Sequence, residues 1–346
     1  MPKILFIGDT HNGANGNNPR LLQQNVELYE RIRKIIYAHN IDFCVDLGDF
    51  FDDREKIDVK TLGVVRNKML KDLPVPFYFI VGNHNLYYKN SSLVNNLTET
   101  IGDLPNVHII DQYTQIPEAS LDLIPWINNA NAEYIAEKIR TSTSKWCAGH
   151  FEFNGFQFDK SRVAEVKEKI SASLFHNYIE VISGHYHIAS HKGNITYLGT
   201  PVQLTWVDVD VEKKLLILNS DTGEHFELAD PTPLYIQFTI NDIHDFNGVH
   251  KEDIAGKRVK IHYHVDITKE DINNLQAILK TWEPDQLTFI PFGQKKIAER
   301  MQVEIAEGLE SSLREYIMAM PSDNDKIKSV IEKLVLSYYN KSNNKE

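Results

Sequence analysis

The chain contains 346 residues, 42% of them hydrophobic and 25% charged, which is typical of a soluble globular protein with one large or two modest domains. The formal net charge of −11 argues against a protein that holds nucleic acid by a basic surface alone, although carboxylates in a metal site count as negative until cations bind. No apolar run approaches the length of a bilayer span, so we expect no membrane-embedded segment.

The first part of the chain alternates apolar runs with segments of helical periodicity. Strands are predicted at residues 3–8, 42–48 and 77–82, and helices at about residues 19–38 and 57–71. This β-α-β-α-β order predicts parallel strands that are joined by right-handed crossovers.

The middle of the chain predicts shorter elements. They are a helix near residues 91–101, strands at 107–111 and 121–125, a helix at 131–140, a strand at 145–149, a solvated helix or flap at 160–169 and a strand at 178–183. Three β-rich stretches, residues 195–198, 204–211 and 215–219, then indicate an antiparallel second half. The predicted fold class is α/β (α+β), with a two-sheet β-sandwich core flanked by helices.

A proline-containing boundary at residues 230–233 is expected to separate the core, residues 1–230, from a small α+β domain at residues 234–291. Within that domain we predict strands at 235–240, 258–264 and 286–290 and a helix at 268–282. From residue 297 the pattern is helical, and two apolar stripes separated at Pro321 predict a C-terminal helical pair at residues 297–340.

The two cysteines, Cys44 and Cys147, fall inside strands that are expected to be buried. Buried core thiols of this kind are usually reduced, and no secretory signal is visible in the sequence. Both observations predict a cytoplasmic compartment, which would be the host cytoplasm for a viral protein.

Side chains that can bind metals follow the predicted strands where each strand ends. They are Asp9, His11, Asp49, Asn83, His150, His185 and His187. Because ligands of open α/β sheets collect at the carboxyl ends of the strands, this series predicts a two-metal phosphoesterase site, with Asp49 on the central strand suited to bridge the cations. Oxygen and imidazole ligands without thiolates favour manganese or iron, with zinc possible.

A single histidine at a strand exit is usually a plain surface residue, and the chain offers an internal comparison. His262 and His264 repeat the His-x-His spacing of His185 and His187, but they lie within a strand and no glycine precedes them. We therefore predict a structural role for His262 and His264 and a metal-binding role for the ordered series.

His84 directly follows the expected ligand Asn83, so its side chain points in a different direction. An imidazole beside the metals, but not bound to one, can donate a proton to the leaving alkoxide. Asp52 lies one helical turn after Asp49 and is expected to hydrogen-bond the other ring nitrogen of His84, which would keep the ring oriented and protonated. We predict His84 and Asp52 as catalytic residues.

Taken together, five motifs resemble the signature of calcineurin-like metallophosphoesterases. They are Asp9-x-His11, Gly48-Asp49-x-x-Asp52, Gly82-Asn83-His84, Gly149-His150 and Gly184-His185-x-His187. The stretch Gly199-Thr200-Pro201-Val202-Gln203-Leu204 is similar to the Gly-Ser-Pro stretch of SbcD-type recombination nucleases. Residues 123–126 (LIPW) and 149–156 (GHFEFNGF) look closer still to the nuclease subunits of T-even phages.

The resemblance implies a manganese-dependent DNA exonuclease and endonuclease that acts in recombination and repair with an SbcC-like ABC-type ATPase, and as a homodimer. It implies one cation held by Asp9, His11, Asp49 and His187, a second held by Asp49, Asn83, His150 and His185, and His84 as the catalytic histidine. The chain departs from the family in one respect, since Asn85 stands where the family usually has Asp, and this puts the tuning of His84 in question.

The resemblance also implies roles for the other two domains. The small α+β domain would be a DNA-binding cap, and the C-terminal helical pair would dock the coiled coil of the ATPase. The alternative for that pair is packing on its own catalytic domain. Two alternative functions stay open: a phosphodiesterase for small molecules such as nucleotides, and a non-catalytic scaffold on the same fold.

Overall fold

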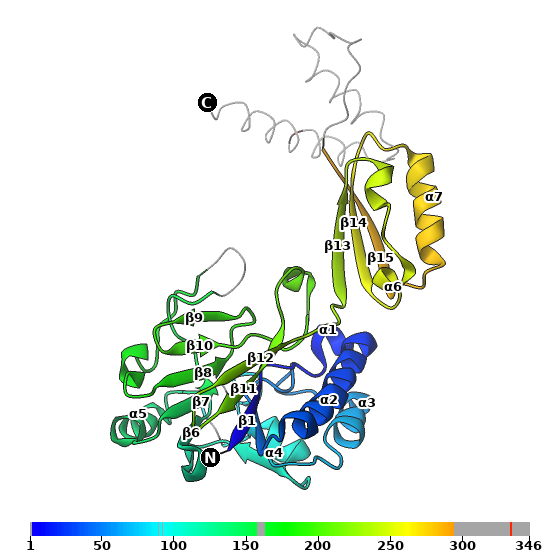
Figure 1. Ribbon diagram of the computed structural model, residues 1–346. Helices are drawn as coiled ribbons and strands as arrows, with labels where there is room; N and C mark the ends of the chain where they lie inside the picture. The colour runs from blue at the N-terminus through cyan, green and yellow to red at the C-terminus, as the bar shows by residue number, and fades with distance from the viewer. Residues whose placement is uncertain (1, 89, 92, 158–162, 294–332, 334–346) are drawn as a thin grey trace. The chain divides into compact units, whose positions relative to one another are not determined.

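The structure is a computed structural model that describes residues 2–88, 90, 91, 93–157, 163–293 and 333. The chain as far as Phe292 forms one compact unit. The described part of that unit contains two six-stranded sheets and one three-stranded sheet (Figure 1). The predicted C-terminal helical pair, residues 297–340, lies outside the described residues except for Lys333.

The first sheet has the strand order β12-β11-β1-β2-β3-β4. Its strands are β1 (Lys3–Ile7), β2 (Phe43–Asp46), β3 (Phe77–Ile80), β4 (Val107–Ile110), β11 (Lys214–Asn219) and β12 (His225–Ala229). Strands β1 to β4 are parallel, which confirms the predicted β-α-β-α-β unit, and β11 and β12 extend the sheet in antiparallel fashion.

The second sheet has the order β5-β6-β7-β8-β10-β9. Its strands are β5 (Thr114–Ile116), β6 (Leu121–Ile124), β7 (Trp146–His150), β8 (Glu180–Gly184), β9 (Ser190–Lys192) and β10 (Ile195–Tyr197). Strands β6, β7, β8 and β10 are parallel, and β5 and β9 pair antiparallel at the two edges. The expectation of an antiparallel second half from residue 195 therefore holds for β11 and β12, whereas β10 is parallel to β8 and antiparallel to β9.

An apolar cluster fills the space between the two sheets, so the two sheets form the predicted sandwich. Ile4, Phe6 and Val45 from the first sheet pack there with Leu123 and Ile182 from the second, all of them fully buried. The alternating in-and-out pattern of each strand sends its other side chains to an outer layer of helices.

The helices cover the outer faces of both sheets (Figure 1). They are α2 (Pro19–His39), α3 (Val59–Val64), which continues as a π-helical segment at Val65–Met69, α4 (Asn96–Ile101) and α5 (Ala132–Thr141), while Ala14 of the short α1 (Ala14–Asn17) packs with Leu234 and Tyr235. Asn18 caps α2 by accepting from the backbone N–H groups of Arg20 and Leu21, next to Pro19 in the first turn. Buried side chains of α2 pack against the first sheet, and those of α5 pack against the second.

One predicted strand, residues 204–211, is wrong. That segment contains a 3-10 turn at Trp206–Asp208, and three further 3-10 turns lie at Pro117–Ala119, Ala172–Phe175 and Ile243–Phe246. The Asp208 carboxylate accepts from the backbone N–H groups of Leu204 and Thr205, so a capping box replaces the strand ladder. The predicted helix or flap at 160–169 is not helical at residues 163–169. Its first three residues, 160–162, lie outside the described part.

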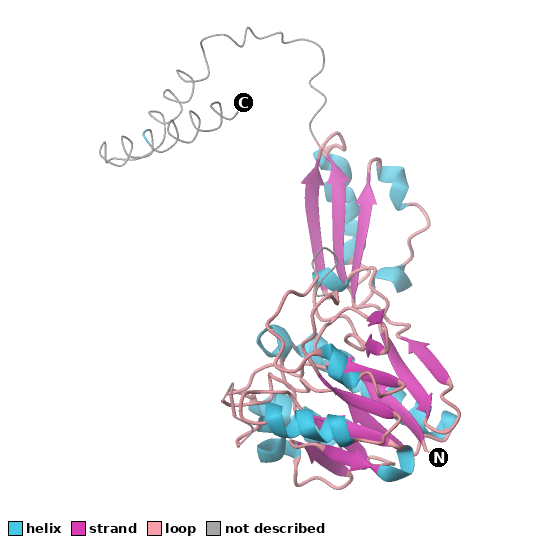
Figure 2. Cartoon of the chain, turned by 90° about the vertical axis from the view of Figure 1, so that its left-hand side faces the viewer, coloured by secondary structure: helices cyan, strands magenta, loops and turns pink. Residues whose placement is uncertain are grey.

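The last described segment is a three-stranded parallel sheet in the order β13-β14-β15 (Figure 2). Its elements are β13 (Tyr235–Ile240), α6 (Lys251–Ile254), β14 (Arg258–His264), α7 (Lys269–Lys280) and β15 (Gln286–Phe292), which match the three strands and the helix expected from sequence. Val259, Ile261 and Leu279 form its own buried core. None of the described helices is long and apolar enough to cross a bilayer.

Candidate metal centre

The loops that follow β1, β2, β3, β7 and β8 bring the candidate site residues together. Three groups of side chains have ligand atoms that all lie within 4.8 Å of one another. The groups are Asp9, His11 and His187; Asp49, His150 and His185; and His11, Asp52 and His84. Asn83 joins the second group, since its Oδ1 lies 3.0 Å from His150 Nε2 and 3.0 Å from His185 Nδ1. All nine residues singled out from the sequence thus meet at one end of the sandwich.

The first group is rich in acceptor atoms, and Asp9 and His11 in it are buried while His187 is half-buried. Asp9 is fully buried, and its Oδ1 has no hydrogen-bond partner among the described residues. The Nε2 atoms of His11 and His187 lie 3.0 Å apart, while His11 Nδ1 faces Asp52 Oδ1 at 3.1 Å. The imidazole nitrogens and the carboxylate oxygen therefore converge on a small space that has few protons to share.

The second group is arranged so that lone pairs face one another. His150 Nδ1 lies 2.8 Å from the backbone oxygen of Leu47, an acceptor only, so Nδ1 carries a proton and Nε2 is the nitrogen that has a lone pair when the ring is neutral. That Nε2 faces Asn83 Oδ1 at 3.0 Å and Asp49 Oδ2 at 3.3 Å, two more acceptors. Three acceptors turned toward one point are the arrangement that a bound cation satisfies.

Glycines allow the close approach of these loops. A Cβ at Gly82 would lie 2.2 Å from Asp49 Oδ1, and a Cβ at Gly184 would lie 2.3 Å from Asp9 Oδ1, so neither position has room for a side chain. Three site residues, His11, Asp49 and His185, also adopt positive φ angles of 44°, 50° and 91°. Backbone strain of this kind persists where the surrounding structure enforces it, and it concentrates at functional sites.

The electrostatics of the centre reflect buried charges that lack a counterion. Burial raises the pKa of Asp9 to about 6. Burial lowers the pKa of His150, but the carboxylates of Asp49 and Asp9 raise it more, to about 9, so without a cation the ring also carries a proton on Nε2, which a bound cation would replace. Burial, helped by the neighbouring His11, lowers the pKa of His187 to about 3, so that imidazole is neutral. Neutral imidazoles and buried carboxylates fit divalent cations, which would neutralise the site without a proton.

His84 lies beside this centre, and its contact with Asp52 differs from the expected one. His84 Nδ1 faces the backbone carbonyl oxygen of Asp52 at 2.5 Å, whereas the Asp52 carboxylate pairs with His11. The Asp52 backbone N–H donates to the Asn12 carbonyl, which fixes the turn so that the carbonyl of Asp52 faces His84 and its side chain faces His11. The backbone N–H of His84 donates to Asp49 Oδ1 at 2.8 Å.

Three residues around the centre escaped the sequence reasoning or received another role there. Glu152 Oε1 lies 3.6 Å from His185 Nε2, and the Trp126 ring packs 5.1 Å from the His185 ring. The Asn85 side chain turns to the backbone, since its Oδ1 accepts from the N–H groups of Asp49 and Gly82, both at 3.0 Å. The alternation after β7, with Phe151 and Phe153 buried, is a signal that could have placed Glu152 toward the site.

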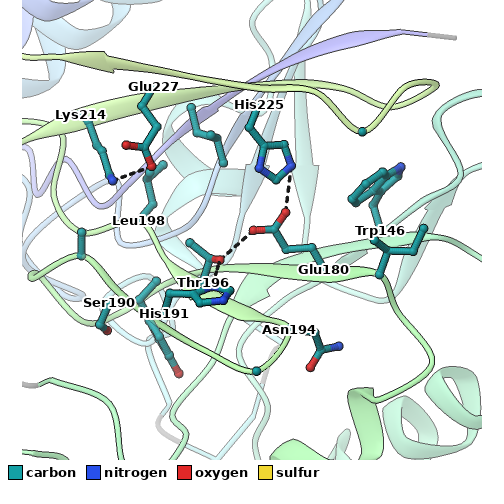
Figure 3. Close-up of a pocket in the computed structure, with 16 residues that line it drawn as sticks. Trp146, Glu180, Ser190, His191, Asn194, Thr196, Leu198, Lys214, His225 and Glu227 are labelled. Carbon is teal, nitrogen blue, oxygen red and sulfur yellow. Dashed lines mark hydrogen bonds and ion pairs between the residues drawn. The ribbon is translucent and has the colours of Figure 1, made fainter.

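A separate cavity of about 600 Å³ opens between β8–β10 and β11–β12 (Figure 3). Its charged side chains pair with one another: His225 Nε2 with Glu180 Oε2 at 2.9 Å, and Lys214 Nζ with Glu227 Oε1 at 2.6 Å. None of the nine candidate site residues lines it. The charges of this cavity are already satisfied, and we assign the chemistry to the metal-binding groups.

Comparison with known proteins gives one family and two relatives. The family described as calcineurin-like phosphoesterase matches residues 2–189, more than half of the chain. Exonuclease subunit 1 of Enterobacteria phage T4 is 33% identical over 224 residues, which are 64% of this chain and 65% of the relative. The 078R protein of Invertebrate iridescent virus 3, which carries a provisional phosphoesterase name, is 27% identical over 215 residues, 58% of this chain and 57% of the relative.

Both alignments thus cover less than two thirds of the relative's own length. Among solved structures, one described as a novel archaeal phosphodiesterase covers 66% of this chain and 99% of its own, at 12% identity and a TM-score of 0.33. A TM-score that low supports no conclusion about this chain.

Proposed function

Because the chain belongs to the calcineurin-like phosphoesterase family, we propose that it is a metal-dependent phosphodiesterase that cleaves DNA as an exonuclease and endonuclease. The observation that carries this proposal is that two groups of candidate ligands lie at the same end of the sandwich, one of Asp9, His11 and His187 and the other of Asp49, His150 and His185, with the His11 N–H bonded to the Asp49 carbonyl. The similarity to a phage protein named as an exonuclease subunit supports DNA as the substrate over a small phosphodiester.

Two divalent cations would be held by the residues that converge at the strand ends. Asp9, His11, Asp49 and His187 would hold one, and Asp49, Asn83, His150 and His185 would hold the other. Bound cations of this kind activate a water and stabilise the leaving oxygen of a phosphodiester. The mixture of oxygen and imidazole donors without thiolates favours manganese.

The chain's own residues would supply the proton and the orientation. We propose that His84 donates a proton to the leaving alkoxide, because its ring lies beside the groups that hold the cations. The carbonyl of Asp52 accepts from Nδ1, so donation to the leaving oxygen requires the imidazolium form of His84, whose second proton is on Nε2 and is the one given up. The Asp52 carboxylate would orient His11 by its contact with Nδ1.

Our proposal of partners is based on the relatives and on the exposed apolar side chains. The word subunit in the name of the phage relative supports a complex, for which we propose an SbcC-like ABC-type ATPase bound by residues 297–340. A homodimer is supported by large apolar side chains that are exposed in the segment following His84, among them Tyr88 at 55% and Leu93 at 90% exposure. A cytoplasmic site of action follows from the same proposal.

The function is tested by Mn²⁺-dependent cleavage of linear double-stranded DNA. Asp49→Ala and His187→Ala should abolish cleavage, because each removes a residue that would bind a cation. His191→Ala is the control, since His191 lies on the edge strand β9 and lines the separate cavity. Wild-type cleavage by either folded site variant contradicts the proposed site.

The same assay separates the alternatives. A wild-type protein that hydrolyses a chromogenic phosphodiester but not DNA would be a small-molecule phosphodiesterase. A wild-type protein that binds no Mn²⁺ and hydrolyses neither substrate would be a scaffold.

A further inference from the structure

A buried lysine outside the proposed site holds the backbone of one of its residues. Lys213 is 5% exposed, and it precedes β11. Its Nζ lies 3.0 Å from the backbone oxygen of His187, 2.7 Å from Thr200 Oγ1 and 2.6 Å from Asp208 Oδ1. Three ammonium protons therefore meet three acceptors, and a buried ammonium group is stable only with such pairing.

His187 depends on contacts of this kind because it lies in the loop between β8 and β9. His187 therefore belongs to neither strand, and its backbone is not held by strand-to-strand hydrogen bonds. Its backbone oxygen accepts from Lys213 and also from the Thr200 N–H at 3.3 Å, while its Nε2 faces His11 Nε2 at 3.0 Å. A shift of the His187 backbone would move the imidazole out of the group with Asp9 and His11.

The other end of the lysine's ion pair is anchored to the start of β13. Asp208 accepts from the backbone of Leu204 and Thr205, and the side-chain N–H of Gln203 donates to the backbone oxygen of Asp208 at 3.1 Å. Gln203 Oε1 in turn accepts from the backbone N–H of Tyr235 at 2.7 Å. A continuous series of hydrogen bonds thus joins Tyr235 to His187.

We propose that Lys213 is a positioning residue: it fixes the backbone of His187 so that the imidazole stays within the group formed with Asp9 and His11, and it ties that group to β13. This inference rests on the proposed metal-binding function. It goes beyond that function because Lys213 is not one of the proposed ligands and holds His187 through the backbone carbonyl. A lysine that served stability alone would leave cation binding by a folded protein unchanged.

The test is calorimetric titration of Mn²⁺ into the full-length, metal-free protein. Lys213→Met should weaken one of two Mn²⁺ sites by about 10-fold or more, as loss of an orienting contact outside the ligands typically does, and should leave the other site unchanged. Lys214→Met is the matched control, because the neighbouring lysine pairs with Glu227 and not with a site residue. It should retain both affinities.

A double variant shows whether Lys213 acts through His187. In His187→Ala the same site should already be weakened, and adding Lys213→Met should weaken it no further. Additive losses in the double variant, or wild-type affinity for both ions in folded Lys213→Met, overturn the proposal.

Two further results keep the outcomes separate. If Lys213→Met does not fold, Lys213→Met combined with Asp208→Asn removes both charges of the buried pair, and the same prediction applies to that variant. If the wild-type protein binds no Mn²⁺, the proposed function itself fails. If the wild type binds two ions and both Lys213 variants bind them equally well, only the inference about Lys213 fails.

Discussion

At the level of single residues, the centre is built from acceptor atoms that face one another. His150 uses its Nδ1 proton on Leu47, so its Nε2, once deprotonated, directs a lone pair toward Asn83 and Asp49. Asp9 adds a buried oxygen that has no hydrogen-bond partner among the described residues. Such an arrangement costs stability until a cation is bound, because a buried charge without a partner is unfavourable.

Replacing Asp9 by Asn should therefore separate stability from cation binding. The neutral amide removes a buried charge whose ionised form burial disfavours, while its oxygen can still accept from the backbone N–H of His185. We expect metal-free Asp9→Asn to melt at a higher temperature than the metal-free wild type and to lose most of the rise that Mn²⁺ gives the wild type. Thermal unfolding with and without Mn²⁺ measures both effects, and an unchanged Mn²⁺ response in the variant would remove Asp9 from the site.

His84→Ala should leave Mn²⁺ affinity largely intact and slow turnover by about 10²–10⁴-fold, the usual loss for a general acid. A phosphodiester with a much better leaving group needs less protonation and should be cleaved at nearly the wild-type rate. The measurement is kcat on good and poor leaving groups for wild type and variant. An equal loss on both would show that His84 acts in some other way.

The single residues that sequence reasoning assigned differently share a physical cause. Asp52 was expected to contact His84 through its carboxylate, but a backbone hydrogen bond to Asn12 turns its carbonyl there. Asn85 drew notice as a departure from a motif, yet its side chain holds the backbone of Asp49 and Gly82. Spacing along a chain brings residues to one place, whereas the direction of each polar atom depends on turns that the sequence does not specify.

At the level of elements, strand ends were predictable and loops were not. Apolar runs and the glycines after them placed β1, β2, β3, β7 and β8, and with them every residue of the candidate site. Residues 204–211 have an apolar content typical of a strand, but Asp208 captures the local backbone N–H groups and forms a turn. Side-chain hydrogen bonds to the backbone compete with strand pairing, and composition alone does not reveal which prevails.

An ion pair across the sandwich links β8 to β12 and gives a pH-dependent prediction. The hydrogen bond to Glu180 raises the pKa of His225 above its ordinary value of about 6.5. The stabilisation that protonated His225 gives the fold is therefore complete below about pH 6.5 and is lost as the pH rises through the raised pKa. Burial raises the pKa of Glu180, but bonds from His225 and Thr196 lower it more, to below its ordinary value. Its stabilisation is present above about pH 4.3 and is lost as the pH falls through the lowered value.

The pair therefore stabilises most between about pH 4.3 and 6.5. Glu180→Gln should reduce the free energy of unfolding at pH 6 by up to about 1 kcal/mol, since the His225 side chain is 34% exposed, and by less at pH 9. Urea unfolding at the two pH values measures this difference. A loss that is the same or larger at pH 9 would rule out an ionised pair.

At the level of the whole molecule, the sandwich predicted from sequence is the observed core, with helices outside both sheets. The three strands and the helix that follow residue 234 also lie where periodicity placed them. Assembly is a different matter, because a surface that binds a second chain carries the same residue types as a buried core. Leu93 and Tyr88 became recognisable as surface only when the fold was known.

Leu93→Asp should convert a homodimer to monomers if the apolar side chains in the segment following His84 form the contact between copies, since a charge placed in an apolar interface is unfavourable. Phe226→Asp is the control: Phe226 is 51% exposed on the edge strand β12. Light scattering during size-exclusion chromatography gives the mass of each variant. Monomers from Phe226→Asp and dimers from Leu93→Asp would place the interface elsewhere.

We propose that this member of the family holds two divalent cations on Asp49 and its neighbours. Anomalous diffraction at the manganese edge, from crystals of the protein grown with Mn²⁺, tests it most directly. We predict two peaks, one among Asp9, His11 and His187 and one among Asn83, His150 and His185, with Asp49 next to both. A single peak, or peaks located only elsewhere, such as beside Glu180 and His225, would contradict the account.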